Sequence, residues 1–382
     1  LWLPATEADG GGIIGFDGSN TRHLVVPVEV TPTTVPRAVD EPTLLPTGVE
    51  ADAPPFAGTC PPSTDPSAPG PADQPRPDAE FVGVQAAAFD TKAGQILYVD
   101  RLGETWAFDV CTNTWDALNP TGAMLGDLSG GLIYDVDSDM TVAFAYGAIS
   151  IYDATTNAWT RGAAFPGGGA PFGAVYDPVS GLIVTSTVRG DEGSTTDPVR
   201  LEAWSYDVDE NAWALLEVLW TEKDDGEMVW SDLLGYSPEI DRFIFANAQN
   251  VTALVDLRTG EQTMIETPTP AVTFGWPKAQ FGQAAGTAFV ARGVHIDSGA
   301  FDDVLEDQIC GYDADASAWT TCFAMPGGSK YAAHGAIIGD PVNNRLVLIH
   351  GIYGNFWVDS DDAVWAVDLD TGETTELLAQ SD

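Results

Sequence analysis

The sequence predicts an all-β protein built as a six-bladed β-propeller, or a seven-bladed one if an N-terminal hairpin contributes. Two short hairpin patterns, each recurring six times, support this prediction, and their repeat interval is typical of propeller blades. A proline-rich stretch separates the repeats from the N-terminus. We therefore expect an N-terminal strand-forming segment (1–30), a proline-rich linker (31–80) and the propeller (81–382).

The first pattern predicts the outer hairpin of each blade. Alternating apolar residues lead into an Asp, whose carboxylate can accept a backbone N–H two residues on, and a later Asn or Gly tolerates left-handed backbone. A Trp such as Trp115 or Trp159 follows in most copies, and we expect it to pack against the neighbouring blade. The Asp recurs at intervals of 44 to 57 residues, as Asp109, Asp153, Asp207, Asp256, Asp313 and Asp368.

The second pattern precedes each copy of the first and predicts an inner hairpin. Its copies begin at Ala88, Ile133, Val175, Gly235, Gln280 and Ile338. Two hairpins make a four-stranded blade, and six such units can close into a ring. The alternative is a β-sandwich with coincidental turns.

The repeats resemble those of the kelch family and of galactose-oxidase-like propellers, in which a similar Tyr-Asp-x-x-x-Asn-x-Trp element forms the outer strands of each blade. The resemblance covers about four-fifths of the chain and implies the propeller fold. Kelch repeats usually carry a Gly-Gly pair after the second strand, where this chain has Tyr98-Val-Asp and Phe144-Ala-Tyr. The chain therefore resembles a divergent member, and the copper-binding set of galactose oxidases has no counterpart in it.

The N-terminal segment contains one further copy of the inner-hairpin pattern, in residues 12–30, which looks like half a blade. Such strands cannot bury an apolar face alone. They could pack beside their own propeller, contribute to a seventh blade, or pair with another subunit, which would make the protein self-associate. Residues 31–80, with 13 of the 26 prolines, would supply the reach.

Composition limits the partners and the compartment. A net charge of −42 disfavours nucleic acid and anionic membranes, and no apolar run approaches the roughly 18 residues of a membrane helix. The sequence begins with Leu1, with neither an initiator Met nor a leader, so we expect a processed chain that is secreted, periplasmic or at the cell surface.

The four cysteines divide into two pairs. Cys310 and Cys322 flank a predicted hairpin, which would place them on facing strands within bridging reach. Cys60, in the proline-rich stretch, and Cys111, in the first outer turn, would then join the linker to the propeller. The alternative is that these last two remain free thiols.

Loop lengths indicate where a partner would bind. The inner-turn and outer-turn Asp residues are 19 and 18 residues apart in the first two blades, but 30 and 28 apart in the third and sixth. These second-to-third-strand connections share one face with the links between blades, and functional residues concentrate on such loops. We call it the long-loop face. Its cations, histidines and aromatic residues suit a protein or glycan partner, unless they are ordinary loop residues: Arg189, Arg200, Trp276, Lys278, Arg292, His295, Lys330, Tyr331, His334, His350, Tyr353 and Trp357.

One acidic segment suggests a metal. Asp135, Asp137 and Asp139 alternate as carboxylates do in calcium loops, although the Gly and distal Glu of a full loop are missing. Calcium is thus the one cofactor that the sequence suggests. A solvated turn is the alternative.

No motif indicates a reaction. The four histidines are dispersed, without metal-binding spacing, and no nucleophile elbow or phosphate loop is visible. The sequence therefore predicts a non-enzymatic, extracellular module that binds a protein or another ligand, or a structural component of an assembly. The alternative is a polysaccharide-active lyase or hydrolase that uses carboxylates, or His334 and His350, on the long-loop face.

Overall fold

The computed structural model describes most of the repeat region and parts of the segment before it. The described residues are 2–4, 13–15, 43–46, 58–77, 87–100, 102–124, 128–145, 148–167, 171–190, 200–221, 231–247, 251–266, 280–284, 287–291, 308–313, 316–324, 336–349, 362–379 and 381. The chain divides into two compact units, Leu1–Asp40 and Glu41–Asp382.

The second unit contains six four-stranded antiparallel sheets, each formed by strands consecutive in sequence. Blade 1 consists of β3 (Ala87–Asp90), β4 (Gln95–Val99), β5 (Thr105–Asp109) and β6 (Thr114–Ala117). Blade 2 consists of β7 (Leu128–Asp135), β8 (Met140–Ala145), β9 (Ala148–Asp153) and β10 (Ala158–Arg161). Blade 3 consists of β11 (Phe172–Asp177), β12 (Leu182–Arg189), β13 (Arg200–Asp207) and β14 (Ala212–Thr221).

The remaining three blades repeat this order. Blade 4 consists of β15 (Ser231–Ser237), β16 (Arg242–Asn247), β17 (Val251–Asp256) and β18 (Glu261–Glu266). Blade 5 consists of β19 (Gln280–Ala284), β20 (Thr287–Ala291), β21 (Gln308–Asp313) and β22 (Ala318–Ala324). Blade 6 consists of β23 (Ala336–Asp340), β24 (Arg345–Ile349), β25 (Val364–Asp368) and β26 (Thr374–Leu378).

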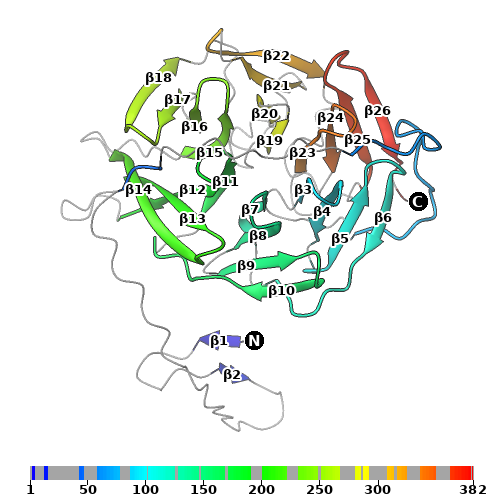
Figure 1. Ribbon diagram of the computed structural model, residues 1–382, viewed down its shortest axis with the longest axis horizontal. Coiled ribbons are helices and arrows are strands. Elements are labelled where there is room, and N and C mark those ends of the chain that lie inside the picture. Colours follow the sequence, from blue (N-terminus) through cyan, green and yellow to red (C-terminus); the bar gives the residue numbers. More distant parts are fainter. Residues whose placement is uncertain are drawn as a thin grey trace, which may run out of the picture. The chain divides into compact units, whose positions relative to one another are not determined.

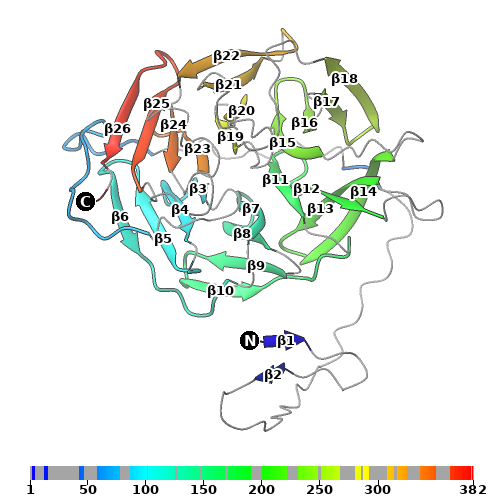
Figure 2. The ribbon, with the colours of Figure 1, turned by 180° about the vertical axis from the view of Figure 1, so that it is seen from behind.

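The six sheets form a closed ring, as the views from both sides show (Figures 1 and 2). The innermost strands contact one another in sequence order, β3 to β7, β11, β15, β19 and β23, and β23 returns to β3. The predicted propeller is therefore confirmed, with six blades. The part of the chain that the structure describes contains no helix, and so none long and apolar enough to cross a bilayer.

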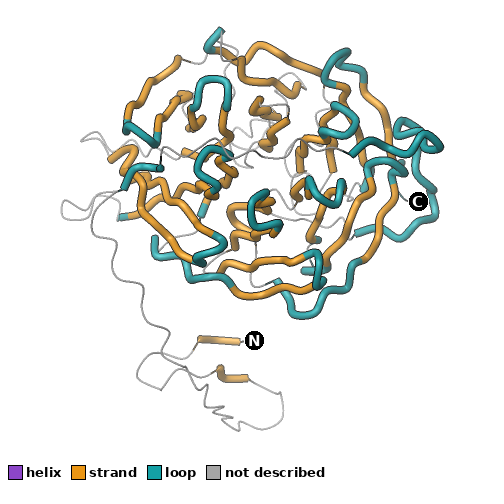
Figure 3. Tube along the Cα trace, in the orientation of Figure 1, coloured by secondary structure: helices purple, strands orange, loops and turns teal. Residues whose placement is uncertain are grey.

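Short turns join strands one and two and strands three and four in blades 1 to 4 and in blade 6 (Figure 3). In the outer turn of blade 1, Asp109 Oδ1 accepts the backbone N–H of Cys111 (2.8 Å) and of Thr112 (3.0 Å). Asn113 then adopts a φ of 54°, and Asn157 and Gly260 do the same in other blades, with φ of 49° and 78°. The carboxylate bond recurs at Asp90, Asp135, Asp153, Asp177, Asp207, Asp256, Asp313, Asp340 and Asp368. The turn chemistry expected from the sequence is confirmed.

The apolar core lies between neighbouring blades, and the returning Trp residues belong to it. The ring of Trp213 in blade 3 lies 4.7 Å from that of Tyr206 in the same blade and 6.0 Å from that of Phe144 in blade 2. Trp159 in blade 2 donates from Nε1 to Thr105 Oγ1 of blade 1 (2.8 Å). These Trp residues pack against the preceding blade, as the repeat pattern predicts.

The first unit contains a two-stranded antiparallel sheet of β1 (Trp2–Pro4) and β2 (Ile13–Gly15). Trp2 faces Gly15 and Pro4 faces Ile13. The start of the predicted 12–30 hairpin is therefore paired with the residues before it. Residues 16–30, including the predicted second strand, lie outside the described residues. Among the described sheets of the propeller, none includes a strand from this unit.

Two stretches of the predicted proline-rich linker belong to the same compact unit as the propeller. In the first, residues 43–46, Thr43 N donates to the carbonyl of Leu215 in blade 3 (2.8 Å), and Leu45 N donates to that of Leu257 in blade 4 (2.9 Å). We call the second stretch, residues 58–77, the strap. It follows the junction between blades 6 and 1 and is drawn in blue beside β26 and β6 (Figures 1 and 2).

Candidate functional site

The long-loop face is partly described in blade 3, where two predicted binding residues lie side by side. Arg189 ends β12 and Arg200 begins β13, and their Cα atoms are direct partners in the sheet. Side chains of such partners project from the same side of a sheet. The structure thus places two cations at the base of the long loop between these strands.

Arg200 is held by a buried carboxylate. Its Nε donates to Glu202 Oε1 (2.7 Å), and the indole Nε1 of Trp204 donates to Glu202 Oε2 (3.1 Å). Glu202 is 2% exposed. Both carboxylate oxygens are therefore engaged from within blade 3, and Glu202 positions the guanidinium of Arg200 beside Arg189.

Most of the cations that the structure describes are paired. Six of the eight described Arg and Lys side chains form ion pairs with carboxylates: Arg76, Lys92, Arg200, Arg242, Arg258 and Arg345. Arg189 is exposed, and no carboxylate of the described residues pairs with it. Among the described residues at this end of blade 3, Arg189 is therefore the cation whose guanidinium is exposed.

The remaining predicted residues of the long-loop face lie outside the described residues, so their placement stays a prediction. They are Trp276, Lys278, Arg292, His295, Lys330, Tyr331, His334, His350, Tyr353 and Trp357.

The three carboxylates suggested for calcium do not form one ligand set. Asp135 Oδ1 accepts the backbone N–H of Asp137 (3.0 Å), so it serves the turn. Asp139 Oδ1 accepts the hydroxyl of Tyr134 (2.7 Å), and its other oxygen pairs with Lys92. Among the residues that the structure describes, no group of three or more His, Cys, Asp or Glu side chains is arranged to hold a metal. Burial raises the pKa of Asp135 to about 6.

Both predicted disulfides are confirmed. Cys310 and Cys322 are direct partners on β21 and β22 and are bonded to each other. Cys60, in the strap, is bonded to Cys111 in the outer turn of blade 1. The described cysteines include no free thiol.

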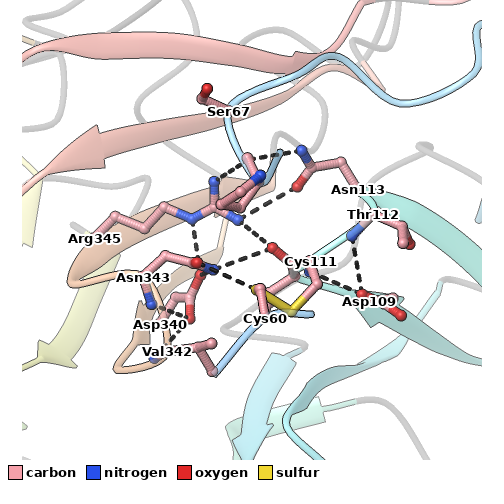
Figure 4. Close-up of polar contacts among 12 residues, drawn as sticks. Cys60, Ser67, Asp109, Cys111, Thr112, Asn113, Asp340, Val342, Asn343 and Arg345 are labelled. Carbon is pink, nitrogen blue, oxygen red and sulfur yellow. Dashed lines mark hydrogen bonds and ion pairs between the residues drawn. A yellow bond between two sulfur atoms is a disulfide. The ribbon is translucent and has the colours of Figure 1, made fainter. Parts of the chain in front are cut away.

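The junction of blades 6 and 1 is a polar site that the sequence did not reveal (Figure 4). Arg345 of blade 6 donates from Nε to Asp340 Oδ2 of its own blade (2.8 Å), and its side chain is 7% exposed. Its Nη2 donates to the carbonyl of Val110 in blade 1 (2.7 Å), and its Nη1 to the carbonyl of Pro66 in the strap (2.8 Å). One guanidinium thus joins blade 6, blade 1 and the strap.

Asn113 completes the contact from the side of blade 1. Its Oδ1 accepts from Arg345 Nη2 (3.3 Å), and its Nδ2 donates to the carbonyls of Pro66 (2.9 Å) and Ala68 (2.8 Å). Asn343 Nδ2 of blade 6 reaches the carbonyl of Val110 (3.1 Å). Every hydrogen-bonding group of the Asn113 side chain has a partner, and the residue is 0% exposed.

A second Arg joins blades 3 and 4 in the same manner. Arg258 of blade 4 donates to both oxygens of Asp177 in blade 3 (2.9 and 3.0 Å) and to Asp241 of its own blade. It also donates to the carbonyl of Pro46 (3.3 Å). Burial alone lowers the pKa of Arg258, but the hydrogen bonds to the two carboxylates outweigh it and raise the pKa.

The signal for these two Arg residues in the sequence is weak. Both lie in or beside a turn that the repeat pattern predicts, and Arg242 stands in the blade 4 position that corresponds to Arg345. The local sequence offers Arg345 only Asp340, where blade 4 has Ser237, because its carbonyl partners at Pro66 and Val110 lie more than two hundred positions away.

No protein-family model matches the sequence, and no curated protein matches it significantly. Among solved structures, the chain is similar to a structural-genomics protein of unknown function from Bacteroides thetaiotaomicron VPI-5482. The two share 11% identity with a TM-score of 0.48, over 75% of this chain and 72% of that one.

Proposed function

We propose that the protein is a non-enzymatic binding module that is secreted, periplasmic or at the cell surface, with blades related to kelch repeats. Its rigid ring presents the long-loop face to a protein or glycan partner, in isolation or as a component of an assembly. Two disulfides support an oxidising compartment, since such bonds persist outside the reducing cytosol.

The Arg189 and Arg200 pair is the observation that carries this proposal. In a chain of net charge −42, two adjacent cations at the base of a long loop are unusual, and Arg189 is exposed. Charges farther away than the Debye length of about 8 Å at physiological salt are largely screened. Short-range contacts therefore decide which groups bind here, and the exposed guanidinium of Arg189 favours carboxylate or sulfate groups on the partner.

The test uses two anionic probes, polygalacturonate and poly-glutamate, at physiological salt. We expect Arg189→Glu to weaken binding of at least one probe by roughly threefold to tenfold, since each exposed ion pair contributes about 1 kcal/mol or less. Lys92→Glu is the matched control. It makes the same charge change on the face of the propeller opposite the long-loop face, at a side chain that is 68% exposed. It should leave binding unchanged.

Three outcomes would count against this proposal. If neither probe binds, or if both variants weaken binding equally, the Arg pair is not the site. If the polysaccharide is progressively shortened, the protein is an enzyme, and the lyase or hydrolase alternative replaces the binding module.

A further inference from the structure

A ring of six blades built from one chain has five covalent links between blades, and the junction between blades 6 and 1 has none of its own. A strand exchanged between the first and last blade could fill this role. Here, among the described strands, each of the six sheets contains its own four consecutive strands and no other. The strap lies across this junction, so its contacts can be compared with those of an ordinary link.

The link between blades 1 and 2 attaches to blade 2 through a bridge at Thr121. Thr121 N donates to the carbonyl of Asn157 (2.9 Å), and its own carbonyl accepts from Trp159 N (2.8 Å). Asn157 Nδ2 also donates to the carbonyl of Leu118 in the link (2.7 Å). Asn157 is the left-handed residue of the outer turn, two positions before the returning Trp.

The strap makes the same set of contacts with blade 1, but uses a side chain in place of a peptide. Gln74 Nε2 donates to the carbonyl of Asn113 (3.1 Å), and Gln74 Oε1 accepts from Trp115 N (2.6 Å). Asn113 Nδ2 donates to the carbonyl of Ala68, as Asn157 does to Leu118. The side-chain amide of Gln74 thus reproduces the donor and the acceptor that Thr121 offers from its backbone.

Both the strap and the link between blades 1 and 2 also contain a glycine that lies against the backbone of the blade they contact. A Cβ added to Gly70 of the strap would lie 2.0 Å from the carbonyl oxygen of Asn113, and one added to Gly122 of the link would lie 2.4 Å from that of Trp159. Both segments therefore approach the backbone of the next blade too closely for any side chain. On its other side the strap is bound to blade 6, where Gly70 N donates to the carbonyl of Leu377 (2.8 Å).

We infer that the strap, residues 58–77, acts as the missing sixth link of the ring, and that the Cys60–Cys111 disulfide is a reducible cross-link that holds it in place. The two disulfides differ in what they hold. Cys310–Cys322 joins neighbouring strands within blade 5, 12 residues apart, and connects no two blades. Cys60–Cys111 spans 51 residues and binds the strap to blade 1.

Reduction converts this covalent attachment into a reversible one. A dithiol reductant attacks the disulfide, gives up two electrons and two protons to form Cys60 and Cys111 thiols, and leaves as its own cyclic disulfide. Both cysteines are half-buried, so the bond is within reach of a small thiol. The strap is then held by hydrogen bonds alone, and the junction of blades 6 and 1 opens more often.

Hydrogen exchange on the full chain tests the cross-link. The N–H groups of Trp115 and Gly70 report strap docking, because they donate to Gln74 Oε1 and to Leu377. We expect their exchange to accelerate by roughly tenfold or more when the folded protein is treated with dithiothreitol, and in the Cys60→Ala/Cys111→Ala variant. The Cys310→Ala/Cys322→Ala variant is the control and should leave both rates unchanged. Unchanged exchange after reduction of Cys60–Cys111 would overturn the inference.

A second pair of measurements tests the strap as a link without touching any cysteine. Gln74→Glu keeps the shape but replaces the donor to the Asn113 carbonyl by an oxygen that this carbonyl repels, so the exchange of Gly70 N–H should accelerate with the disulfide intact. Trypsin cleavage after the buried Arg345 reports opening of the junction, and it should accelerate under the same conditions as strap release. If the strap is released while Arg345 stays protected, the strap does not close the ring and this half of the inference fails.

Discussion

Asp135 is a buried turn residue whose carboxyl group should make the protein less stable as the pH rises. It is 2% exposed, and burial raises its pKa from 3.8 to about 6. The folded state therefore holds a proton between these values that the unfolded state has released, so the stabilisation is present below pH 3.8 and lost as the pH rises through about 6. Asn keeps an oxygen for the turn N–H groups. We expect Asp135→Asn to stabilise the protein at pH 7 by up to about 3 kcal/mol, and less at pH 4.5.

Asp153, in the outer turn of the same blade, provides the control of opposite sign. The hydroxyl of Thr156 donates to it (2.7 Å) and holds its pKa below the usual value. The ionised carboxylate of Asp153 therefore stabilises the folded protein above the pKa of the unfolded state, and this stabilisation is lost on acidification. Asp153→Asn should lower the free energy of unfolding at pH 7, and lower it less at low pH. Urea unfolding of both variants at the two pH values measures this. The same pH trend in both variants would contradict the assignment.

Leu45 tests whether residues 43–46 are docked on the propeller. It is 2% exposed, among Leu257 and other apolar residues of blades 3 and 4, whereas the adjacent Leu44 is 50% exposed. We expect Leu45→Ala to lower the free energy of unfolding by about 2–4 kcal/mol. If residues 43–46 detach before the propeller unfolds, the loss is limited to the free energy with which this segment is docked. Leu44→Ala should change stability by less than about 0.5 kcal/mol. Thermal unfolding and protease cleavage within residues 43–57 would show the difference, and equal behaviour of the two variants would mean that the segment is not docked.

At the scale of single residues, turns are predictable and docking is not. Asp109 and Asn113 carry out their turn roles within five residues of sequence, so the pattern Asp-x-x-x-Asn reveals them. Leu45 and Gln74 act on residues distant in the chain, in a segment whose prolines describe only its local backbone. The same limit hid Glu202, because a buried Glu in a strand does not differ in sequence from an exposed one.

Among the structural elements, the junction of blades 6 and 1 contains a buried ion pair, Arg345–Asp340. Arg345→Ala would leave Asp340, whose side chain is 0% exposed, without its cation. We expect a loss of about 3 kcal/mol. Arg242→Ala is the matched control, since Arg242 occupies the same position in blade 4. Its side chain is 30% exposed in its pair with Asp256. This substitution should lower the free energy of unfolding by less than about 1 kcal/mol. Denaturant unfolding of both variants gives the comparison, and similar losses would mean that burial does not set the value of the pair.

The N-terminal sheet is the element whose role remains a proposal. Two strands of three residues, β1 and β2, cannot be stable alone in water, so we propose that another edge completes them, on this chain or on a second copy. Deletion of residues 1–30 should lower the mass in solution if the partner is a second copy, and lower the melting temperature if it is this propeller. Light scattering and calorimetry separate these cases. No change in either measurement would show that the segment is dispensable.

At the scale of the whole molecule, the acidic surface should make stability depend on salt. A net charge of −42 repels itself, and raising NaCl from about 20 mM to about 500 mM shortens the screening distance from roughly 20 Å to roughly 4 Å. We expect the melting temperature to rise by several degrees. Tetramethylammonium chloride should have the same effect, because screening does not require a particular cation. A rise with NaCl alone would indicate specific ion binding instead.

The ring as a whole was predictable because each blade is a repeat, and six weak matches reinforce one another. The candidate site was predictable only in outline. Loop length pointed to the end of blade 3, and the structure places Arg189 and Arg200 there as partners. The carboxylates at Asp135, Asp137 and Asp139 had the spacing of ligands, but spacing alone does not show that Asp135 accepts a turn N–H and that Asp139 pairs with Lys92.

The arrangement of every blade from consecutive strands has a consequence for how the gene could be rearranged. A circularly permuted chain that began with β7 and ended with β6 would divide no sheet, because only the connection between blades 1 and 2 would be cut. A designed peptide would then join blades 6 and 1 directly, and residues 58–77 would no longer be needed there. The role of residues 58–77 would thus depend on which two blades lack a covalent link. In the permuted chain that junction would lie between blades 1 and 2, and a side chain such as Gln74 would be needed there to replace the backbone contacts.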